Sequence, residues 1–277
     1  MFNTYNLKQM TMKFTTIPKA KKLTGLAYLG GVNVSAKIIK NMKVSNNITY
    51  SIYLAPAMVS GYNVCPNSTP ECRLGCLATS GRAGMDILSG KGMVERARIK
   101  KTKLFHEHND FFMDWLYAEL RLAKAKAERN GFNFSVRLNA TSDIDWQNVK
   151  RDNKNVFDVF PDVNFYDYTK NPTKFFDKPE NYHLTFSYSG HNVKMCEKLL
   201  NRGFNIATVF NVKRESDLPK TFMGYDVING DLTDFRPNDE KGIIVGLKWK
   251  QIANKENNDK IKNSIFVVQP NDERSKY

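Results

Sequence analysis

Short apolar runs alternate with polar or helical segments along the second half of the chain, and this alternation limits the possible folds more than any other feature. Residues 132–139 alternate strictly, with apolar side chains at every second position and polar ones between them. From residue 163 onward, similar runs begin about every 20 residues. With an earlier run before a cysteine-rich loop, the sequence predicts eight strands: 48–54, 132–139, 163–168, 183–188, 205–210, 225–228, 243–247 and 265–268.

Strands that alternate with helical connections are typical of a parallel α/β sheet. Eight of them predict an α/β fold of the (β/α) barrel type, TIM-like and either closed or partial, with an open doubly wound sheet as the rival. We expect the barrel domain over 46–268, with an inserted helical segment at 92–130. Residues 1–45 are expected to form a small N-terminal β-containing extension, and residues 269–277 a flexible tail.

The charge of the chain is strongly positive and unevenly distributed. Its 277 residues carry 42 Lys and Arg against 28 Asp and Glu, for a net charge of +14. Residues 1–130 hold 20 of the basic and 8 of the acidic side chains, so most of the excess lies there. A basic half beside a nearly neutral half indicates an anionic partner, and nucleic acid or a nucleotide is the first expectation.

The sequence shows neither a membrane span nor a secretory signal. No run approaches the roughly 18 apolar residues that a membrane span requires. Residues 1–10 lack the apolar core and small-residue cleavage site of a secretory signal. We therefore expect a cytoplasmic protein with no membrane partner.

Three of the four cysteines, Cys65, Cys72 and Cys76, fall within twelve residues directly after the first predicted strand. In a reducing compartment such a cluster favours a metal site over disulfides. Three thiolates from one loop are typical ligands for zinc or for an iron–sulfur cluster. A structural zinc would need a fourth ligand, for which His191 and Cys196 are distant candidates, although a buried small hydrophobe is the more ordinary interpretation of Cys196.

Polar residues gather where the predicted strands end, which is where chemistry collects in parallel α/β folds. The residues at the ends of the second, third and fourth strands are Ser142, Asp143, Asp145, Tyr168, Lys170, Ser187 and Ser189. We expect catalytic roles for Asp143, Asp145 and Lys170. In a zinc hydrolase, one of the two aspartates would serve as the general base for a metal-bound water.

Several motifs in order resemble one known family. They are the segment from Asn33 to Lys37, a strand ending in Leu-Ala-Pro-Ala at 54–57, and the cysteine loop that begins Cys65-Pro and ends Cys76-Leu-Ala. Together with the segments 137–143 and 165–170, they are similar to the phage family called gene product 88. The turn Thr-Ser-Asp at 141–143 departs from the family pattern, which has a glycine before the aspartate. The resemblance implies a phage or mobile-element origin, and hence the host cytoplasm, but no activity.

The layout also resembles that of radical S-adenosylmethionine enzymes, in which three cysteines after the first barrel strand hold a [4Fe-4S] cluster. That resemblance implies that Cys65, Cys72 and Cys76 bind the cluster, with Ser142 and Asp143 near the amino group of S-adenosylmethionine. The side chains of Tyr168, Lys170, Ser187 and Ser189 would then line the cofactor site. The cysteine spacing differs from the usual C-x3-C-x2-C of that superfamily.

Two interpretations from different classes follow. The first is a metal- or iron–sulfur-dependent enzyme of radical S-adenosylmethionine type that acts on a nucleotide or nucleic acid. The second is a non-catalytic nucleic-acid-binding protein with a structural zinc. In the second, bases would stack on tyrosines of the basic half: Tyr28, Tyr50, Tyr53 and Tyr62.

Overall fold

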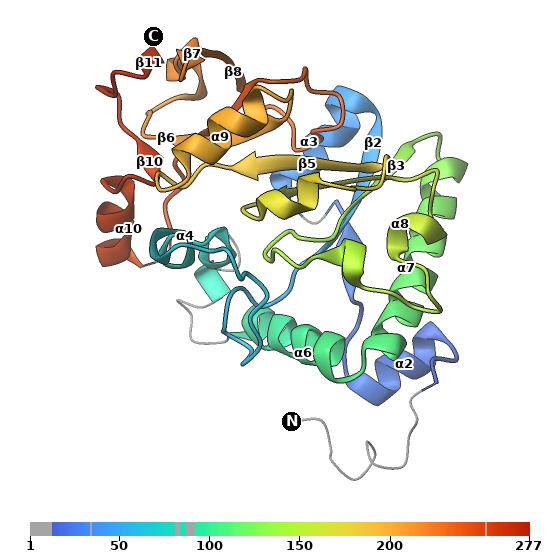
Figure 1. Cartoon of the computed structure of the whole chain (residues 1–277). Helices are drawn as coiled ribbons and strands as arrows, with labels where there is room; N and C mark the ends of the chain where they lie inside the picture. Colours follow the sequence, from blue (N-terminus) through green and yellow to red (C-terminus); the bar gives the residue numbers. More distant parts are fainter. Residues whose placement is uncertain (1–12, 34, 81–83, 87–91, 253) are drawn as a thin grey trace.

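A single mixed sheet of eleven strands runs through the computed structural model, which describes residues 13–33, 35–80, 84–86, 92–252 and 254–277 (Figure 1). The strands are β1 Gly30–Val32, β2 Asn47–Ile52, β3 Asn133–Arg137, β4 Asn164–Thr169, β5 Tyr182–Ser187, β6 Asn205–Phe210, β7 Thr221–Phe222, β8 Tyr225–Asn229, β9 Ile244–Lys248, β10 Val267–Val268 and β11 Ser275–Lys276. The protein is therefore of mixed α/β class, as predicted. Residues 1–10, on which the expectation of no secretory signal rests, lie outside the described part of the chain.

The core of the sheet is a run of seven parallel strands in the order β2-β3-β4-β5-β6-β9-β8. At one edge β1 pairs antiparallel with β2, and at the other β7 and β11 add antiparallel pairs beyond β8. The short β10 lies off this path and pairs with β6. The sheet is open along this order, so the predicted barrel is not confirmed.

All eight predicted strands appear with bounds within a few residues. The last one is reduced to the two residues of β10. It pairs in parallel with the end of β6 and does not close the sheet. The predicted N-terminal extension contributes β1 to the same sheet, and the predicted C-terminal tail contributes β11. The division into domains stays a prediction.

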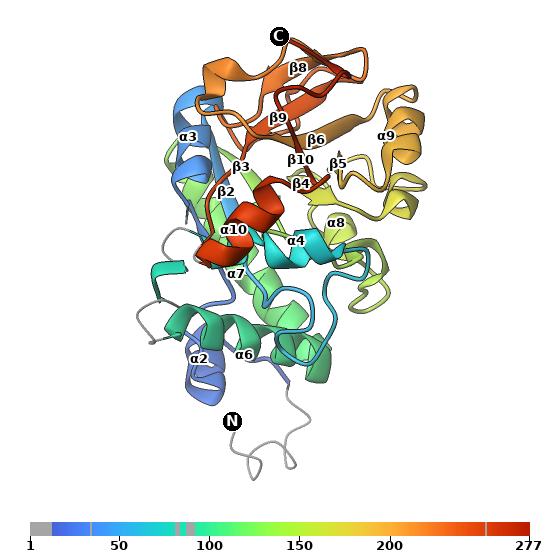
Figure 2. The ribbon, with the colours of Figure 1, turned by 90° about the vertical axis from the view of Figure 1, so that its left-hand side faces the viewer.

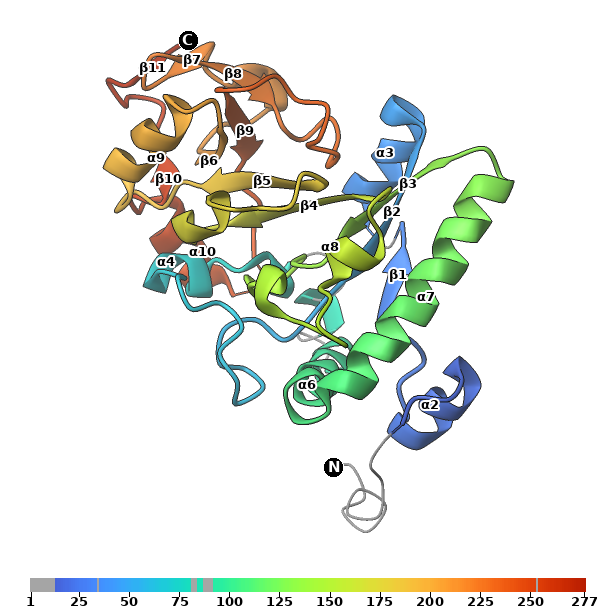
Figure 3. The ribbon, with the colours of Figure 1, turned by 45° about the vertical axis from the view of Figure 1, so that its right-hand side comes forward.

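The helices are α2 Ile17–Thr24, α3 Ala36–Ser45, α4 Pro70–Leu74, α6 Met93–Glu107, α7 Asn109–Arg129, α8 Val156–Val159, α9 Val193–Leu200 and α10 Lys255–Lys262. The predicted helical insertion is thus formed by α6 and α7. In Figure 3, α7 runs along the edge of the sheet beside β1 and β2, with α2 at its start. In the described part of the chain, no helix is both long and apolar enough to span a bilayer.

One face of the sheet is apolar and packs against helices. Phe134 and Val136 of β3 and Phe165 of β4 join the main core, where α7, α8 and α9 supply most of the covering side chains. On α7, residues such as Trp115 and Leu116 are fully buried. The period-two pattern of residues 132–139 therefore predicted this face correctly.

The opposite face of the parallel strands is also largely covered, but it is polar. Ser51 of β2 lies beside Arg137 of β3, and Tyr168 of β4 lies beside Thr185 of β5, all on this face. Ser51 and Thr185 are buried. A buried polar face must satisfy its hydrogen bonds internally, with water or with a ligand, because an unpaired buried polar group is costly.

Helix α3 and the segment after β8 meet across this polar face. Asn41 of α3 accepts hydrogen bonds from the hydroxyl of Thr233 (2.7 Å) and the backbone N–H of Asp234 (2.9 Å). Lys40 donates to the carbonyl of Asp231 at 3.0 Å. These contacts connect the two ends of the parallel run, and Figure 2 shows α3 beside β2 and β3 with β8 close by.

The apolar core predicts a sharp contrast between two leucines of α7. Leu116 is fully buried, whereas 64% of Leu122 is exposed. We expect Leu116→Ala to lower the free energy of unfolding by about 2–5 kcal/mol, since it leaves a cavity under the helix. The same substitution at Leu122 should change it by less than about 0.5 kcal/mol. Urea unfolding followed by circular dichroism measures both values, and equal losses would contradict the packing described here.

Candidate functional site

The cysteine loop leaves the carboxyl end of β2 and is fastened to the turn after β3. The carbonyl of Val64 accepts a hydrogen bond from the backbone N–H of Asp143 at 2.7 Å. The Cys65 Sγ accepts one from the N–H of Ala57 at 3.4 Å and lies 3.9 Å from the carbonyl oxygen of Thr141. The first cysteine therefore lies directly against the turn after β3.

The second and third cysteines are positioned by the short helix α4. The Thr69 hydroxyl caps this helix by accepting from the N–H of Cys72 at 3.2 Å, and Gly75 ends it just before Cys76. A Cβ at Gly75 would come within 2.9 Å of Ile261 on α10, so α4 packs tightly against that helix. Figure 2 shows the two helices side by side.

The three thiols are close enough to influence one another's pKa. Burial, together with the charges of Cys76, Asp143 and Cys72, raises the pKa of Cys65 to about 11. Burial also raises the pKa of Cys76, against the opposing charges of Arg98 and Lys170. Both thiols are therefore protonated at neutral pH until a cation displaces the protons, as a metal does when it binds cysteine.

The donor chemistry of this loop suits a soft metal. Within the described residues, no group of three or more His, Cys, Asp or Glu side chains is arranged to hold a metal ion. Ligation of a zinc ion or an iron–sulfur cluster by Cys65, Cys72 and Cys76 therefore stays a prediction.

Asn139 organises the turn after β3. Its side-chain oxygen accepts hydrogen bonds from the hydroxyl of Ser142 (2.8 Å), the N–H of Ile144 (2.9 Å) and the indole of Trp146 (3.1 Å). Ser142 is thus buried and turned toward its own loop. From the sequence, Asn139 could be predicted only as a polar residue at a strand end. Its three hydrogen bonds depend on the conformation of the turn, which the sequence pattern does not reveal.

Asp143 is a buried carboxylate whose two oxygens both accept hydrogen bonds. They bond to the hydroxyl of Thr169 (2.7 Å), the N–H of Lys170 (2.9 Å) and the ammonium of Lys174 (2.6 Å). The Lys174 side chain is 1% exposed and also donates to the carbonyl of Ile144 at 2.8 Å. These contacts fix the β3 turn against the end of β4, which favours a positioning role for Asp143. No local sequence pattern marks Lys174 as the partner of Asp143.

The other two predicted catalytic residues differ in their surroundings. Asp145 accepts from the Asn148 amide at 2.7 Å, while its second oxygen is buried with no hydrogen-bond partner in the described chain. The Lys170 ammonium lies 5.5 Å from the centre of the Phe266 ring, and its charge lowers the pKa of Cys76. Lys170 therefore lies between the cysteine loop and the end of β4, and the catalytic roles stay predictions.

The loop after β5 reaches the cysteine loop through a contact between His191 and Glu71. His191 Nε2 lies 3.6 Å from a carboxylate oxygen of Glu71 on α4. Asn192 holds the loop by donating to the carbonyl of Ser187 (3.0 Å) and accepting from the N–H of Ser189 (2.9 Å). Cys72 therefore lies at the same end of the sheet as the carboxyl ends of β4 and β5.

Cys196 belongs to the apolar core. It is fully buried on α9, and its thiol lies 3.6 Å from the side-chain oxygen of Asn192. Burial raises its pKa to about 12. These surroundings match the interpretation of Cys196 as a buried small hydrophobe.

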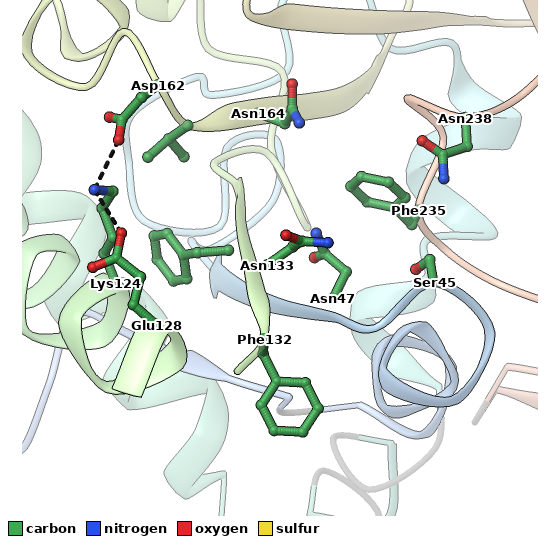
Figure 4. Close-up of a pocket in the computed structure, with 12 residues that line it drawn as sticks. Ser45, Asn47, Lys124, Glu128, Phe132, Asn133, Asp162, Asn164, Phe235 and Asn238 are labelled. Atoms are coloured by element: carbon green, nitrogen blue, oxygen red, sulfur yellow. Dashed lines mark ion pairs between the residues drawn. The ribbon is translucent and has the colours of Figure 1, made fainter. Parts of the chain in front are cut away.

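A cavity of about 360 Å³ lies at the opposite, amino end of the strands (Figure 4). Its lining includes Asn47, Asn133 and Asn164, and the figure shows Lys124 between Glu128 and Asp162. None of the predicted site residues lines it. In parallel α/β folds this end contributes stability more often than chemistry.

The fold and the site define an α/β protein that carries a cysteine-rich loop at the carboxyl edge of an open parallel sheet. Residues 12–264 match the model of the family described as Gene product 88, and the chain belongs to this family. The predicted resemblance is thereby confirmed. Neither the comparison with curated proteins nor that with solved structures gave a match.

The buried pair of Asp143 and Lys174 predicts strong energetic coupling. We expect Asp143→Asn and Lys174→Met each to cost about 3–5 kcal/mol of unfolding free energy, because each leaves a buried group without its partner. The double variant should cost clearly less than the sum of the two. Urea unfolding of all four proteins tests this, with the partly exposed pair Lys124 and Glu128 as a control whose disruption should change little. Additive losses would contradict the coupling.

Proposed function

We propose that this protein is an iron–sulfur enzyme of radical S-adenosylmethionine type that acts on a nucleotide. The observation that carries the proposal is the backbone hydrogen bond between Asp143 and Val64, which fastens the cysteine loop to the turn after β3. This bond joins the predicted cluster ligands to the turn predicted to hold the cofactor's amino group. The open parallel sheet, with α3 across its polar face, would then be a partial barrel.

The roles of the chain's residues follow from their positions. Cys65, Cys72 and Cys76 would hold the cluster. A cluster bound there would supply the one-electron reduction of S-adenosylmethionine that starts hydrogen abstraction from a substrate. Asp143, held by Lys174, keeps the turn in place beside the loop.

The carbonyl oxygen of Thr141 and the hydroxyl of Ser142 lie on the turn next to Cys65, where the amino group of the cofactor is expected. Lys170 places a positive charge near Cys76, which would stabilise thiolate ligands and make the cluster easier to reduce. Tyr168 lies near the carboxyl end of β4, Ser187 ends β5, and Ser189 follows in the loop after β5.

Three of the four tyrosines behind the nucleic-acid-binding alternative already contact other side chains of the protein. Tyr50 is buried and donates to Glu119, and Tyr62 stacks on His106 with ring centres 4.4 Å apart. The ammonium of Lys101 lies 4.5 Å above the Tyr28 ring and is itself mostly buried. Tyr28 nevertheless stays 54% exposed, and nucleic-acid binding stays a prediction.

The ligand set predicts which cysteine substitutions abolish a cluster. Protein reconstituted with iron and sulfide under anaerobic conditions should be brown, with visible thiolate-to-iron absorbance and about four irons per chain. Cys65→Ser, Cys72→Ser and Cys76→Ser should each lose most of this absorbance. Cys196→Ser is the matched control and should keep it, since that thiol belongs to the core.

A functional readout then separates the candidate chemistries. Reconstituted protein given S-adenosylmethionine and dithionite should release 5′-deoxyadenosine and methionine in equal amounts. A colourless protein with one tightly bound zinc would contradict the proposal and support a structural zinc site. A cluster without cofactor cleavage would contradict the radical chemistry alone.

A further inference from the structure

The polar face of the sheet divides into two halves that differ in how well their hydrogen bonds are satisfied. Toward the amino ends, Asn47, Thr49 and Ser135 form a closed network with short contacts. The hydroxyl of Tyr166 donates to Thr49 at 3.2 Å and accepts from the Asn41 amide at 3.2 Å. This half needs no further partner to explain its buried polar groups.

The half toward the carboxyl ends is different. In the part of the chain that the structure describes, six buried atoms there have no hydrogen-bond partner: Ser51 Oγ, Arg137 Nε, Tyr168 Oη, Nε and Nη1 of Arg236, and Asp239 Oδ2. Ser51 and Tyr168 are each the fifth residue of a six-residue strand, and Arg137 ends β3. Buried polar groups in folded proteins are nearly always paired, so a group of orphans in one layer calls for a missing partner.

These residues lie together. The guanidinium of Arg137 is 4.9 Å from the centre of the Tyr168 ring. After burial, the charge of Arg236 has the largest influence on the pKa of Tyr168, followed by the charges of Asp234 and Arg137. Ser51 is the register partner of Arg137 on the neighbouring strand.

The layer holds three largely buried cations and three carboxylates. The cations are Lys37, Arg137 and Arg236, and the carboxylates are Asp231, Asp234 and Asp239. A fourth cation, Lys250, is 44% exposed and pairs with Asp231 at the margin of the layer. The Arg236 side chain is 2% exposed and lies 3.1 Å from Asp239, in a geometry that makes no hydrogen bond. A buried, incompletely bonded arginine is a typical binding group for a phosphate or carboxylate, because its N–H groups form a planar fork.

We propose that Arg137, Arg236, Tyr168 and Ser51 form a binding site for the phosphate group of a small nucleotide. The inference rests on the proposed function for the class of ligand, and it adds the residues that recognise it. We expect a free nucleotide and not a polymer, because the Arg236 side chain is almost completely buried. A small ligand would reach the site from the side of Arg137, whose side chain is 16% exposed.

Conservative removal of a single orphan atom tests the site without disturbing the fold. Tyr168→Phe and Ser51→Ala delete hydroxyls that have no partner in the described chain. Thermal unfolding of these variants should therefore match that of the wild type or improve on it. Titration of metal-free protein with AMP, GMP, CMP and UMP should show saturable binding of at least one nucleotide. Tyr168→Phe should weaken that binding about 10- to 100-fold.

Controls identify the group that is bound. Inorganic phosphate should compete with the nucleotide, whereas the corresponding nucleoside should bind far more weakly. Tyr28→Phe, at an exposed tyrosine, should leave the affinity unchanged. Arg236→Lys, which keeps the charge but loses the fork, should weaken binding more than Tyr168→Phe does.

Three results would overturn the inference: no nucleotide binding by the wild type, equal affinity in Tyr168→Phe and the wild type, or tight binding of single-stranded oligonucleotides only. The first would mean that water alone satisfies the orphan atoms. The assay uses metal-free protein, so its failure is distinct from a failure to assemble the iron–sulfur cluster.

Discussion

The arrangement of the site depends on the hydrogen bonds and the ion pair of one buried carboxylate, that of Asp143. Its two oxygens join the turn after β3 to the end of β4, and Lys174 balances its charge inside the protein. The backbone of the same residue fastens the cysteine loop through Val64. One residue therefore sets the position of three segments that are far apart in the sequence. A charge this deeply buried survives only with such complete bonding.

The two faces of the sheet divide the work between stability and function. The apolar face, covered by α7, α8 and α9, supplies the hydrophobic core. The polar face contains a satisfied network around Tyr166 and an unsatisfied layer around Arg137 and Tyr168. The unsatisfied layer lies near the carboxyl ends of β2, β3 and β4, and the cysteine loop follows β2 at the same end. A protein that needed only stability would not bury a second face rich in Ser, Thr and Arg, because each unpaired group costs free energy.

Much of the fold could be predicted from local patterns. The alternation in residues 132–139 predicted both β3 and its buried face, and the regular spacing of later runs predicted the parallel strands. Helices α2 and α3 were missed, although Thr16 and Ser35 are ordinary N-cap residues that the structure shows in use. Whether the sheet closes could not be predicted from the sequence. The pairing of β10 with β6 joins segments that are far apart along the chain, and no local pattern determines it.

The site was predictable where residues cluster in sequence and not where the fold brings them together. The cysteine loop and the turn containing Ser142 and Asp143 stood out because their residues are neighbours along the chain. Lys174 lies 31 residues beyond Asp143, and Arg236 follows β8 far from its neighbours on β3 and β4. No local pattern marks either residue, since each gains its partners only through tertiary packing.

We propose that the three thiols of one loop hold a cluster with one iron left free of protein ligands at the carboxyl ends of the strands. Electron paramagnetic resonance of the reduced, reconstituted protein tests it most directly. Addition of S-adenosylmethionine should shift the spectrum of the cluster, because the cofactor would bind the iron that has no cysteine ligand. A spectrum that stays unchanged at saturating cofactor would contradict the account.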